Sequence, residues 1–264
     1  MDSEWLRRFA LPGTQPHRDA VQLFCLPHAG GSASAFVPLA RLLAPAVDVL
    51  AAQYPGRQDR RGEPAVEDIA ALADILAEEV HRQATAPYAL FGHSMGALLA
   101  YEVARRLTVH PSTGPATVIL SGRGTPGERP SPHDRLGTDH EILRAVRHLG
   151  GATAHVLDDP ELRAMAMPAL RADYRALSSY VWAPSPPLTV PLAVLVGDDD
   201  PVVTVAQAEA WRTFTTAPTQ LHVFSGGHFF LETHLPQVAR TVETVLLPLR
   251  SPSDGTAPRT LQEK

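Results

Sequence analysis

The segment Gly92–Gly96, with the sequence Gly-His-Ser-Met-Gly, could present a nucleophile. It matches the pattern G-x-S-x-G, in which a serine occupies a tight turn between a strand and a helix. The two glycines permit this turn and a close approach of strand and helix, because neither has a Cβ atom. The free N–H groups at the start of the helix would point at negative charge developing beside Ser94. The segment therefore predicts nucleophilic chemistry at Ser94.

A serine hydroxyl is a weak nucleophile and needs a general base, which a histidine late in the chain can supply. His228 follows two glycines after the last apolar run of strand length. Alone, a histidine in this setting is more often structural, but the order serine, acid, histidine is that of α/β-hydrolases. The acid should follow the preceding apolar run, where Asp198, Asp199 and Asp200 stand in a row. We select Asp200, because Pro201 fixes the backbone after it, and keep Asp198 as the alternative.

The oxyanion of an acyl-transfer intermediate needs two backbone donors. The residue after the nucleophile supplies one of them, here the N–H of Met95. The second should come from the loop after the first apolar run, residues 27–32, with the sequence Pro-His-Ala-Gly-Gly-Ser. We select Ala29, with Gly30 as the alternative. The loop does not indicate phosphate binding, because no Gly-Lys-Ser/Thr follows it.

Three histidines, His28, His93 and His228, offer a competing interpretation as metal ligands. The sequence contains no H-E-x-x-H motif, and no carboxylate–histidine spacing supports a site. We therefore expect no metal and no resident cofactor.

An acyl pocket is predicted less specifically than the catalytic groups. Apolar residues at about 160–180 could line it, but plain packing against the core explains them equally well. Candidate substrate contacts are His28, Phe36, Met165, Tyr174 and Phe229.

These residues need a framework that brings them to one edge. Five short apolar runs predict buried strands, and a sixth, 221–225, alternates a little more. Continuous runs of this kind suit a parallel sheet covered on both faces. Helical spacing between them, at 66–82, 95–107 and 229–248, predicts alternating strands and helices. The fold class is therefore α/β, with a mostly parallel, doubly wound sheet. The order serine, acid, histidine identifies it more narrowly as an α/β-hydrolase fold. The predicted strands are 21–26, 47–53, 88–92, 116–121, 192–197 and 221–225.

The interval of about 122–189 interrupts this alternation. It shows helical patterns at 139–149 and about 160–180, with prolines on both sides. We predict a single domain over 1–250 with a helical lid insertion at 122–189, because long insertions in compact domains are commonly functional. An ordinary helical excursion is the alternative. Residues 251–264 are predicted to form a flexible tail.

Composition excludes several classes of protein. The 264 residues are 44% hydrophobic and 19% charged, which is typical of a soluble globular protein and excludes disorder for most of the chain. A net charge of −5 argues against a nucleic-acid binder. No apolar run is long enough to span a bilayer, and no secretory signal is evident, so we expect a cytoplasmic protein. The single cysteine, Cys25, excludes a disulfide framework and is expected to be a buried strand residue.

Five segments together resemble the type II thioesterases, the stand-alone editing enzymes of polyketide and nonribosomal-peptide synthases. They are 26–33, 54–57, 91–97, 197–201 and 224–230, and the resemblance extends from about 21 to 247. It implies a substrate acyl or aminoacyl group on the phosphopantetheine arm of a carrier protein. Ser94 would attack the thioester, His228 would take its proton, and Asp200 would orient His228.

The resemblance also implies a transient acyl or peptidyl carrier protein partner and a monomeric enzyme. Carrier proteins are usually acidic, so Arg57, Arg60 and Arg61 could form a surface that meets one; a solvated basic loop is the alternative. Two other functions remain open at this point: a lipase or esterase for small esters, and a catalytically silent module that binds a synthase.

Overall fold

A seven-stranded sheet forms the centre of the computed structural model, which describes residues 3–9, 16–17, 19–85, 87–108, 114–127, 131–151, 154 and 157–249. The strand order is β1-β3-β2-β4-β5-β6-β7, and all neighbours are parallel except β1 and β3. This confirms the predicted mostly parallel sheet. The predicted tail at 251–264 lies outside the described residues. The strands are β1 (Leu6–Arg8), β2 (Val21–Leu26), β3 (Val47–Ala52), β4 (Tyr88–His93), β5 (Thr117–Ser121), β6 (Leu192–Gly197) and β7 (Thr219–Phe224).

All six predicted strands are present, and the structure adds β1. This strand pairs antiparallel with β3, with Leu6 opposite Ala52. Only Leu6 of its three residues is buried, while Arg8 is exposed and pairs with Asp48 at 3.1 Å. Three residues are too few to show an alternating pattern, so the sequence did not indicate this edge strand.

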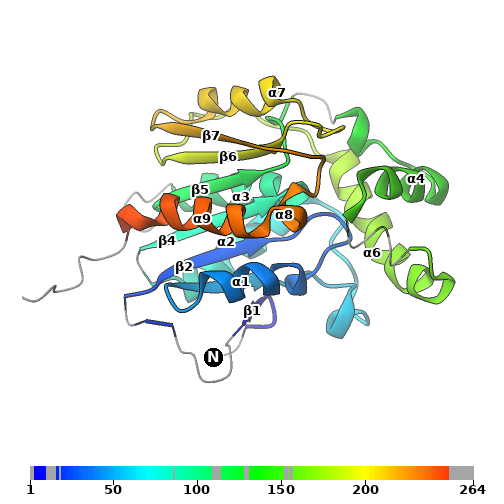
Figure 1. Cartoon of the computed structure of the whole chain (residues 1–264). Helices are drawn as coiled ribbons and strands as arrows, with labels where there is room; N and C mark the ends of the chain where they lie inside the picture. Colours follow the sequence, from blue (N-terminus) through cyan, green and yellow to red (C-terminus); the bar gives the residue numbers. More distant parts are fainter. Residues whose placement is uncertain are drawn as a thin grey trace, which may run out of the picture.

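Helices cover both faces of the sheet (Figure 1). α2 (Ile69–Gln83) and α3 (Met95–Leu107) pack together on one face, and α1 (Val37–Leu43) and α9 (Leu235–Leu246) on the other. The predicted helix at 229–248 is divided into α8 (Phe230–Thr233), α9 and the 3-10 turn η5 (Leu247–Leu249). The division falls where α9 begins at Leu235, with Pro236 in its first turn, where proline needs no N–H partner. α1, with seven residues, is not among the predicted helices. The other short elements are η1 (Ala33–Phe36), η2 (Gln58–Arg60), α7 (Val205–Glu209) and η4 (Ala210–Phe214).

The buried side chains form two apolar clusters, one on each face of the sheet. Cys25 lies in β2 within the cluster under α1 and α9, and it is fully buried. Burial raises the pKa of its thiol well above the ordinary value, so this side chain behaves as a small apolar group.

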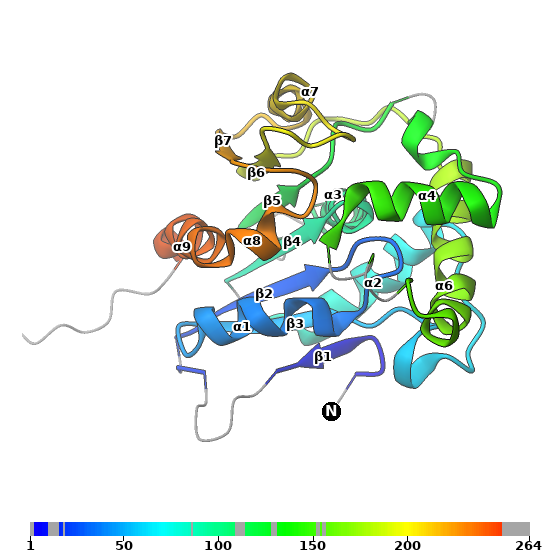
Figure 2. The same cartoon turned by 45° about the vertical axis from the view of Figure 1, so that its right-hand side comes forward.

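Residues between β5 and β6 form η3 (Pro132–Asp134), α4 (Asp139–Leu149) and α6 (Pro160–Ser179). Figure 2 shows α4 and α6 beyond the carboxyl ends of the central strands, away from α1 and α9. A capping box formed by Thr138 and Glu141 starts α4, and Asp159 caps α6. These helices therefore stand over the sheet edge where the predicted catalytic residues should meet.

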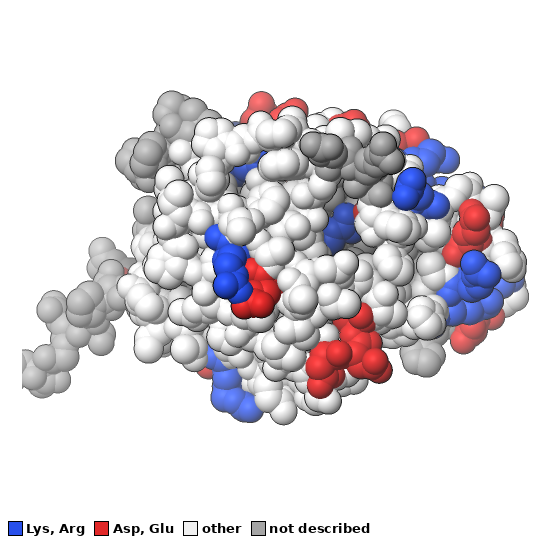
Figure 3. Space-filling view, turned by 90° about the horizontal axis from the view of Figure 1, so that it is seen from above, with Lys and Arg blue, Asp and Glu red and all other residues white. Residues whose placement is uncertain are grey.

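None of the helices in the described part of the chain is long and apolar enough to cross a membrane. Charged side chains on the face drawn in Figure 3 are scattered, and several acidic residues lie beside basic ones. Among the described residues on this face, basic side chains do not gather into the kind of surface that nucleic acids require.

Candidate active site

Ser94 occupies a sharp turn between β4 and α3. Its backbone has φ 57° and ψ −117°, a conformation that costs energy for a residue with a side chain. A Cβ atom at Gly92 would lie 1.9 Å from the carbonyl oxygen of Gly96, and one at Gly96 would lie 1.9 Å from that of Leu26. The Ser94 N–H donates to the carbonyl oxygen of Ser121 at 2.8 Å, which fastens the turn to β5. Both glycines are thus required sterically for this placement of the serine.

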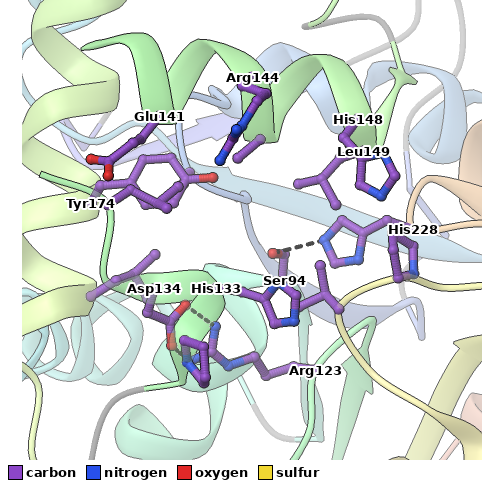
Figure 4. Close-up of a pocket in the computed structure, with 17 residues that line it drawn as sticks. Ser94, Arg123, His133, Asp134, Glu141, Arg144, His148, Leu149, Tyr174 and His228 are labelled. Carbon is purple, nitrogen blue, oxygen red and sulfur yellow. Dashed lines mark hydrogen bonds and ion pairs between the residues drawn. The ribbon is translucent and has the colours of Figure 1, made fainter. Parts of the chain in front are cut away.

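His228 lies between Ser94 and Asp200, and its contact with Ser94 is visible in Figure 4. Its Nε2 atom is 2.9 Å from Ser94 Oγ, and its Nδ1 atom is 2.8 Å from Asp200 Oδ2. The imidazole and the carboxylate are almost completely buried, with side-chain exposures of 1% and 0%. Because the chain of contacts runs from carboxylate to imidazole to hydroxyl, the arrangement can move a proton from Ser94 to His228.

The structure distinguishes the candidate acids. Asp200 Oδ1 accepts the N–H groups of Val202 at 2.8 Å and Val203 at 3.4 Å, so its carboxylate is held from the side opposite His228. Asp198 is exposed and accepts the Gly226 N–H at 2.8 Å, which ties the ends of β6 and β7 together. Asp199 is also exposed. Among the three aspartates, the structure therefore places Asp200 against the imidazole.

The loop after β2 carries the candidate oxyanion donors. The Gly31 N–H donates to the His28 carbonyl oxygen at 2.9 Å, and Gly30 has φ +73°, as in a type II turn. The Gly30 N–H donates to Asp173 Oδ2 at 2.7 Å, so it is already engaged. Ala29 lines the same pocket as Ser94 and His228, and Met95 begins α3 directly after the serine. Of the two loop candidates, Ala29 is the one whose N–H can face a substrate.

The three histidines named in the metal hypothesis pack against one another. The His93 ring lies 5.9 Å from that of His28 and 5.0 Å from that of His228, measured between centroids. His93 Nδ1 is 3.0 Å from Ser121 Oγ. Burial, followed by the charges of neighbouring histidines, holds the pKa of His93 well below its ordinary value. Burial, followed by the charges of His228 and Arg57, lowers the pKa of His28 to about 3. In the described residues, no group of three or more His, Cys, Asp or Glu side chains could hold a metal ion.

A pocket of about 380 Å³ opens beside Ser94 and His228, and Tyr174 lines it (Figure 4). α4 contributes much of the opposite wall. The remaining candidate contacts lie elsewhere. Phe36 is 2% exposed and packs edge-on against Phe91 in the core, and Met165 is 60% exposed on α6.

His28 and Phe229 pack beside His228 and are not among the residues that line this pocket. Their rings lie 4.9 Å apart, and the Phe229 ring is 5.3 Å from that of His228. The two side chains therefore help to form the packing around the imidazole.

The expected basic surface at Arg57, Arg60 and Arg61 is wrong. Arg57 and Arg60 are each 6% exposed. Arg57 pairs with Asp173, and Arg60 with Glu63. The alternative, a solvated basic loop, is also wrong for Arg57 and Arg60, because their ion pairs allow both guanidinium groups to be buried. Of the three arginines, only Arg61 is exposed.

Several polar residues of the pocket were not predicted. Arg123, next to β5, pairs with Asp134 of η3 at 2.6–2.9 Å. Glu141, Arg144 and His148 lie on one face of α4 at helical spacing and line the pocket (Figure 4). No motif surrounds these residues, so only the helical spacing on α4 could have grouped the last three.

Comparisons with known proteins agree with this geometry. The family model described as "Thioesterase domain" matches residues 21–246. A probable cadicidin biosynthesis thioesterase of Streptomyces griseus is 46% identical over 249 residues, which cover 94% of this chain and 68% of the relative. The solved structure of the type II thioesterase BorB from the borrelidin biosynthetic cluster is similar, with 42% identity, a TM-score of 0.84 and coverage of 93% of this chain and 99% of that one. The RedJ thioesterase from the prodiginine pathway of Streptomyces coelicolor has 34% identity, a TM-score of 0.79 and coverage of 90% and 91%.

Proposed function

The chain belongs to the thioesterase domain family, and on that premise we propose that it hydrolyses aberrant or stalled acyl groups from the phosphopantetheine arm of carrier proteins. The contact of Ser94 with His228 and of His228 with Asp200 is the observation that carries the proposal. The type II thioesterases among the relatives support a synthase of polyketides or nonribosomal peptides as the source of these carriers. The cadicidin, borrelidin and prodiginine names belong to different pathways, so we propose the type of synthase and not one pathway such as that of rifamycin.

The reaction begins when Ser94 Oγ attacks the thioester carbonyl carbon and His228 Nε2 takes the hydroxyl proton. The resulting oxyanion accepts hydrogen bonds from the N–H groups of Met95 and Ala29. When the carbon–sulfur bond breaks, His228 returns the proton to the sulfur, and the pantetheine thiol leaves. Water, deprotonated by His228, then attacks the carbonyl carbon of the acyl-serine. The ester bond to Ser94 Oγ breaks, His228 returns the proton to Oγ, and the carboxylic acid leaves. Asp200 keeps the imidazole in the tautomer that both steps need.

The insertion supplies the outer wall of the acyl pocket in this proposal. α4 lies across the pocket from Ser94, so a carrier-bound arm has to enter between α4 and the sheet edge. We propose that α4 is the part of this insertion that acts as a lid, and that the carrier protein binds transiently while the arm occupies the pocket. The chemistry needs no resident cofactor, because Ser94 and His228 carry out every proton transfer and Asp200 orients the imidazole.

The test is a panel of acyl groups attached to a carrier protein, compared with the same groups on small thiols. We expect hydrolysis of acetyl- and propionyl-carrier protein by the natural chain, and no turnover by Ser94→Ala. Cys25→Ala is the matched control: it removes the single thiol of the chain, which is buried in the core cluster on the other face of the sheet from α3, and the variant should keep its activity.

Three results would contradict the proposal. Turnover by a folded Ser94→Ala variant would exclude Ser94 as the nucleophile. Nitrophenyl esters cleaved far faster than any carrier thioester would indicate an esterase. Failure of a fluorophosphonate probe to label Ser94 would indicate a silent module that binds a synthase.

A further inference from the structure

A carboxylate of the insertion reaches the loop that carries the second oxyanion donor. Asp173 belongs to α6, and its Oδ2 atom accepts the Gly30 N–H at 2.7 Å. The two residues are 143 positions apart in the sequence. Asp173 is completely buried, so this hydrogen bond is shielded from water.

Arg57, in the segment that follows β3, completes the contact. Its Nη1 and Nη2 atoms donate to Asp173 Oδ2 and Oδ1, each at 2.8 Å, and Nη1 also donates to the Gly31 carbonyl oxygen at 3.0 Å. The ion pair therefore holds the turn at two points, the N–H of Gly30 and the carbonyl of Gly31. Replacing a buried ion pair with apolar residues is often neutral or stabilising, so stability alone does not account for this pair.

Packing leaves the turn little room to move. A Cβ atom at Gly30 would lie 2.4 Å from Leu170 Cδ2 on α6, so the helix presses directly on the turn. On the other side, the Tyr54 hydroxyl donates to the Pro27 carbonyl oxygen at 3.2 Å, and the Arg57 guanidinium lies over the Tyr54 ring at 5.0 Å. The turn is thus held between α6 and the segment after β3.

The restraint extends to the Ala29 N–H through the peptide plane. The His28 carbonyl and the Ala29 N–H are the two ends of one planar unit. The carbonyl end accepts the Gly31 N–H at 2.9 Å, inside the turn that Asp173 and Arg57 hold. The direction of the Ala29 N–H is therefore set by the same contacts.

We propose that Asp173 and Arg57 are positioning residues that aim the Ala29 N–H at the oxyanion. Docking of α6 is then a condition for catalysis, and α6 is a fixed part of the site although it belongs to the insertion. This inference rests on the proposed function only in taking Ala29 as an oxyanion donor.

The experiment uses the full chain and acyl-pantetheine thioesters, with Asp173→Asn and Arg57→Lys. The first change removes the negative charge. The second keeps a positive charge opposite Asp173 but replaces the planar, two-pronged guanidinium with a single donor atom. Loss of one oxyanion donor costs about 100- to 1000-fold in kcat, so misdirecting one should cost about 10- to 100-fold with KM nearly unchanged. A trifluoromethyl ketone analogue, which forms a tetrahedral adduct with Ser94, should bind more weakly by the factor by which kcat/KM falls.

A purely structural role would give a different result. It would lower the fraction of serine titrated by a fluorophosphonate and leave the affinity of the titrated molecules for the ketone unchanged, which would overturn the inference. Wild-type kcat in either folded variant would overturn it as well. Arg175→Gln is the matched control, because it breaks an ion pair from α6 to Glu67 that does not contact the turn, and it should change neither value.

The proposal that the substrate is carrier-bound can fail independently of this inference. If the natural chain cleaves acyl-pantetheine but no carrier-bound substrate, the proposed substrate is wrong, while the comparison of variants still tests Asp173 and Arg57.

Discussion

The change Asp200→Asn should remove most of the hydrolytic activity while leaving the backbone of the protein unchanged. In the natural chain, Asp200 Oδ1 accepts the Val202 N–H at 2.8 Å, and Oδ2 faces His228 Nδ1 at 2.8 Å. The introduced amide has one oxygen acceptor and one NH₂ donor. Its oxygen should stay with the Val202 N–H. If the amide turned over, its NH₂ group would face the Val202 N–H, and that buried N–H would lose its acceptor at a cost of about 1–3 kcal/mol.

The consequence is a change of tautomer at His228. The amide NH₂ then faces Nδ1, so Nδ1 has to accept and the ring hydrogen moves to Nε2. An Nε2 atom that already carries hydrogen cannot take the proton of Ser94, which lies 2.9 Å away. The equivalent change in a serine triad lowers kcat about 10⁴-fold, equivalent to about 5.4 kcal/mol in the activation barrier. We expect a loss of this order here.

The assay follows thiol release from acyl-pantetheine, with thermal unfolding as the control for folding. Asp198→Asn is the matched variant: the side chain is exposed, and an amide oxygen can still accept the Gly226 N–H. Its kcat should change by no more than about twofold. If Asp200→Asn keeps more than a tenth of kcat, or if Asp198→Asn loses as much, our assignment of the acid is refuted.

Three further predictions concern folding, the pH dependence of stability and the length of the acyl chain of the substrate. Gly92→Ala should prevent correct folding, because its Cβ atom would lie 1.9 Å from the Gly96 oxygen, whereas Gly62→Ala meets nothing within 4 Å; soluble yield and melting temperature compare them. The lowered pKa of His93 means that only the unfolded chain binds that proton below about pH 6.5, so the free energy of unfolding should fall with acidity by up to about 1.4 kcal/mol per pH unit. Urea titrations from pH 7.5 to 5 should show a shallower slope for His93→Gln; an equal slope contradicts this. Ala145→Phe should fill the pocket and lower kcat/KM more for octanoyl than for acetyl thioesters, and parallel losses would place the acyl chain elsewhere.

The strands and the order of the catalytic groups were accessible from the sequence. Buried parallel strands leave continuous apolar runs, and the six runs coincide with β2 to β7 to within two residues. The turn at Ser94 has a local signature because its backbone geometry excludes side chains at two nearby positions. By contrast, β1 and α1 are too short for a periodic signal.

The roles of the arginines and of most pocket residues depend on contacts that are distant in the sequence. Arg57 has the same side chain as an exposed arginine, and only the arrival of Asp173 from α6 makes its burial possible. The same applies to Phe36 and Met165, whose apolar character was compatible with a pocket, with the core and with the surface.

Residue types and spacing predicted the type of fold, a nucleophile at Ser94 and the chain order of a triad, because each of these predictions draws on local backbone geometry or on burial in a regular element. Only the tertiary structure decided between Asp200 and Asp198, engaged the Gly30 N–H and brought α6 to the turn after β2. These outcomes depend on directions of hydrogen bonds between segments far apart in the chain. Residue types and spacing do not encode such directions; the packed sheet and its insertion do.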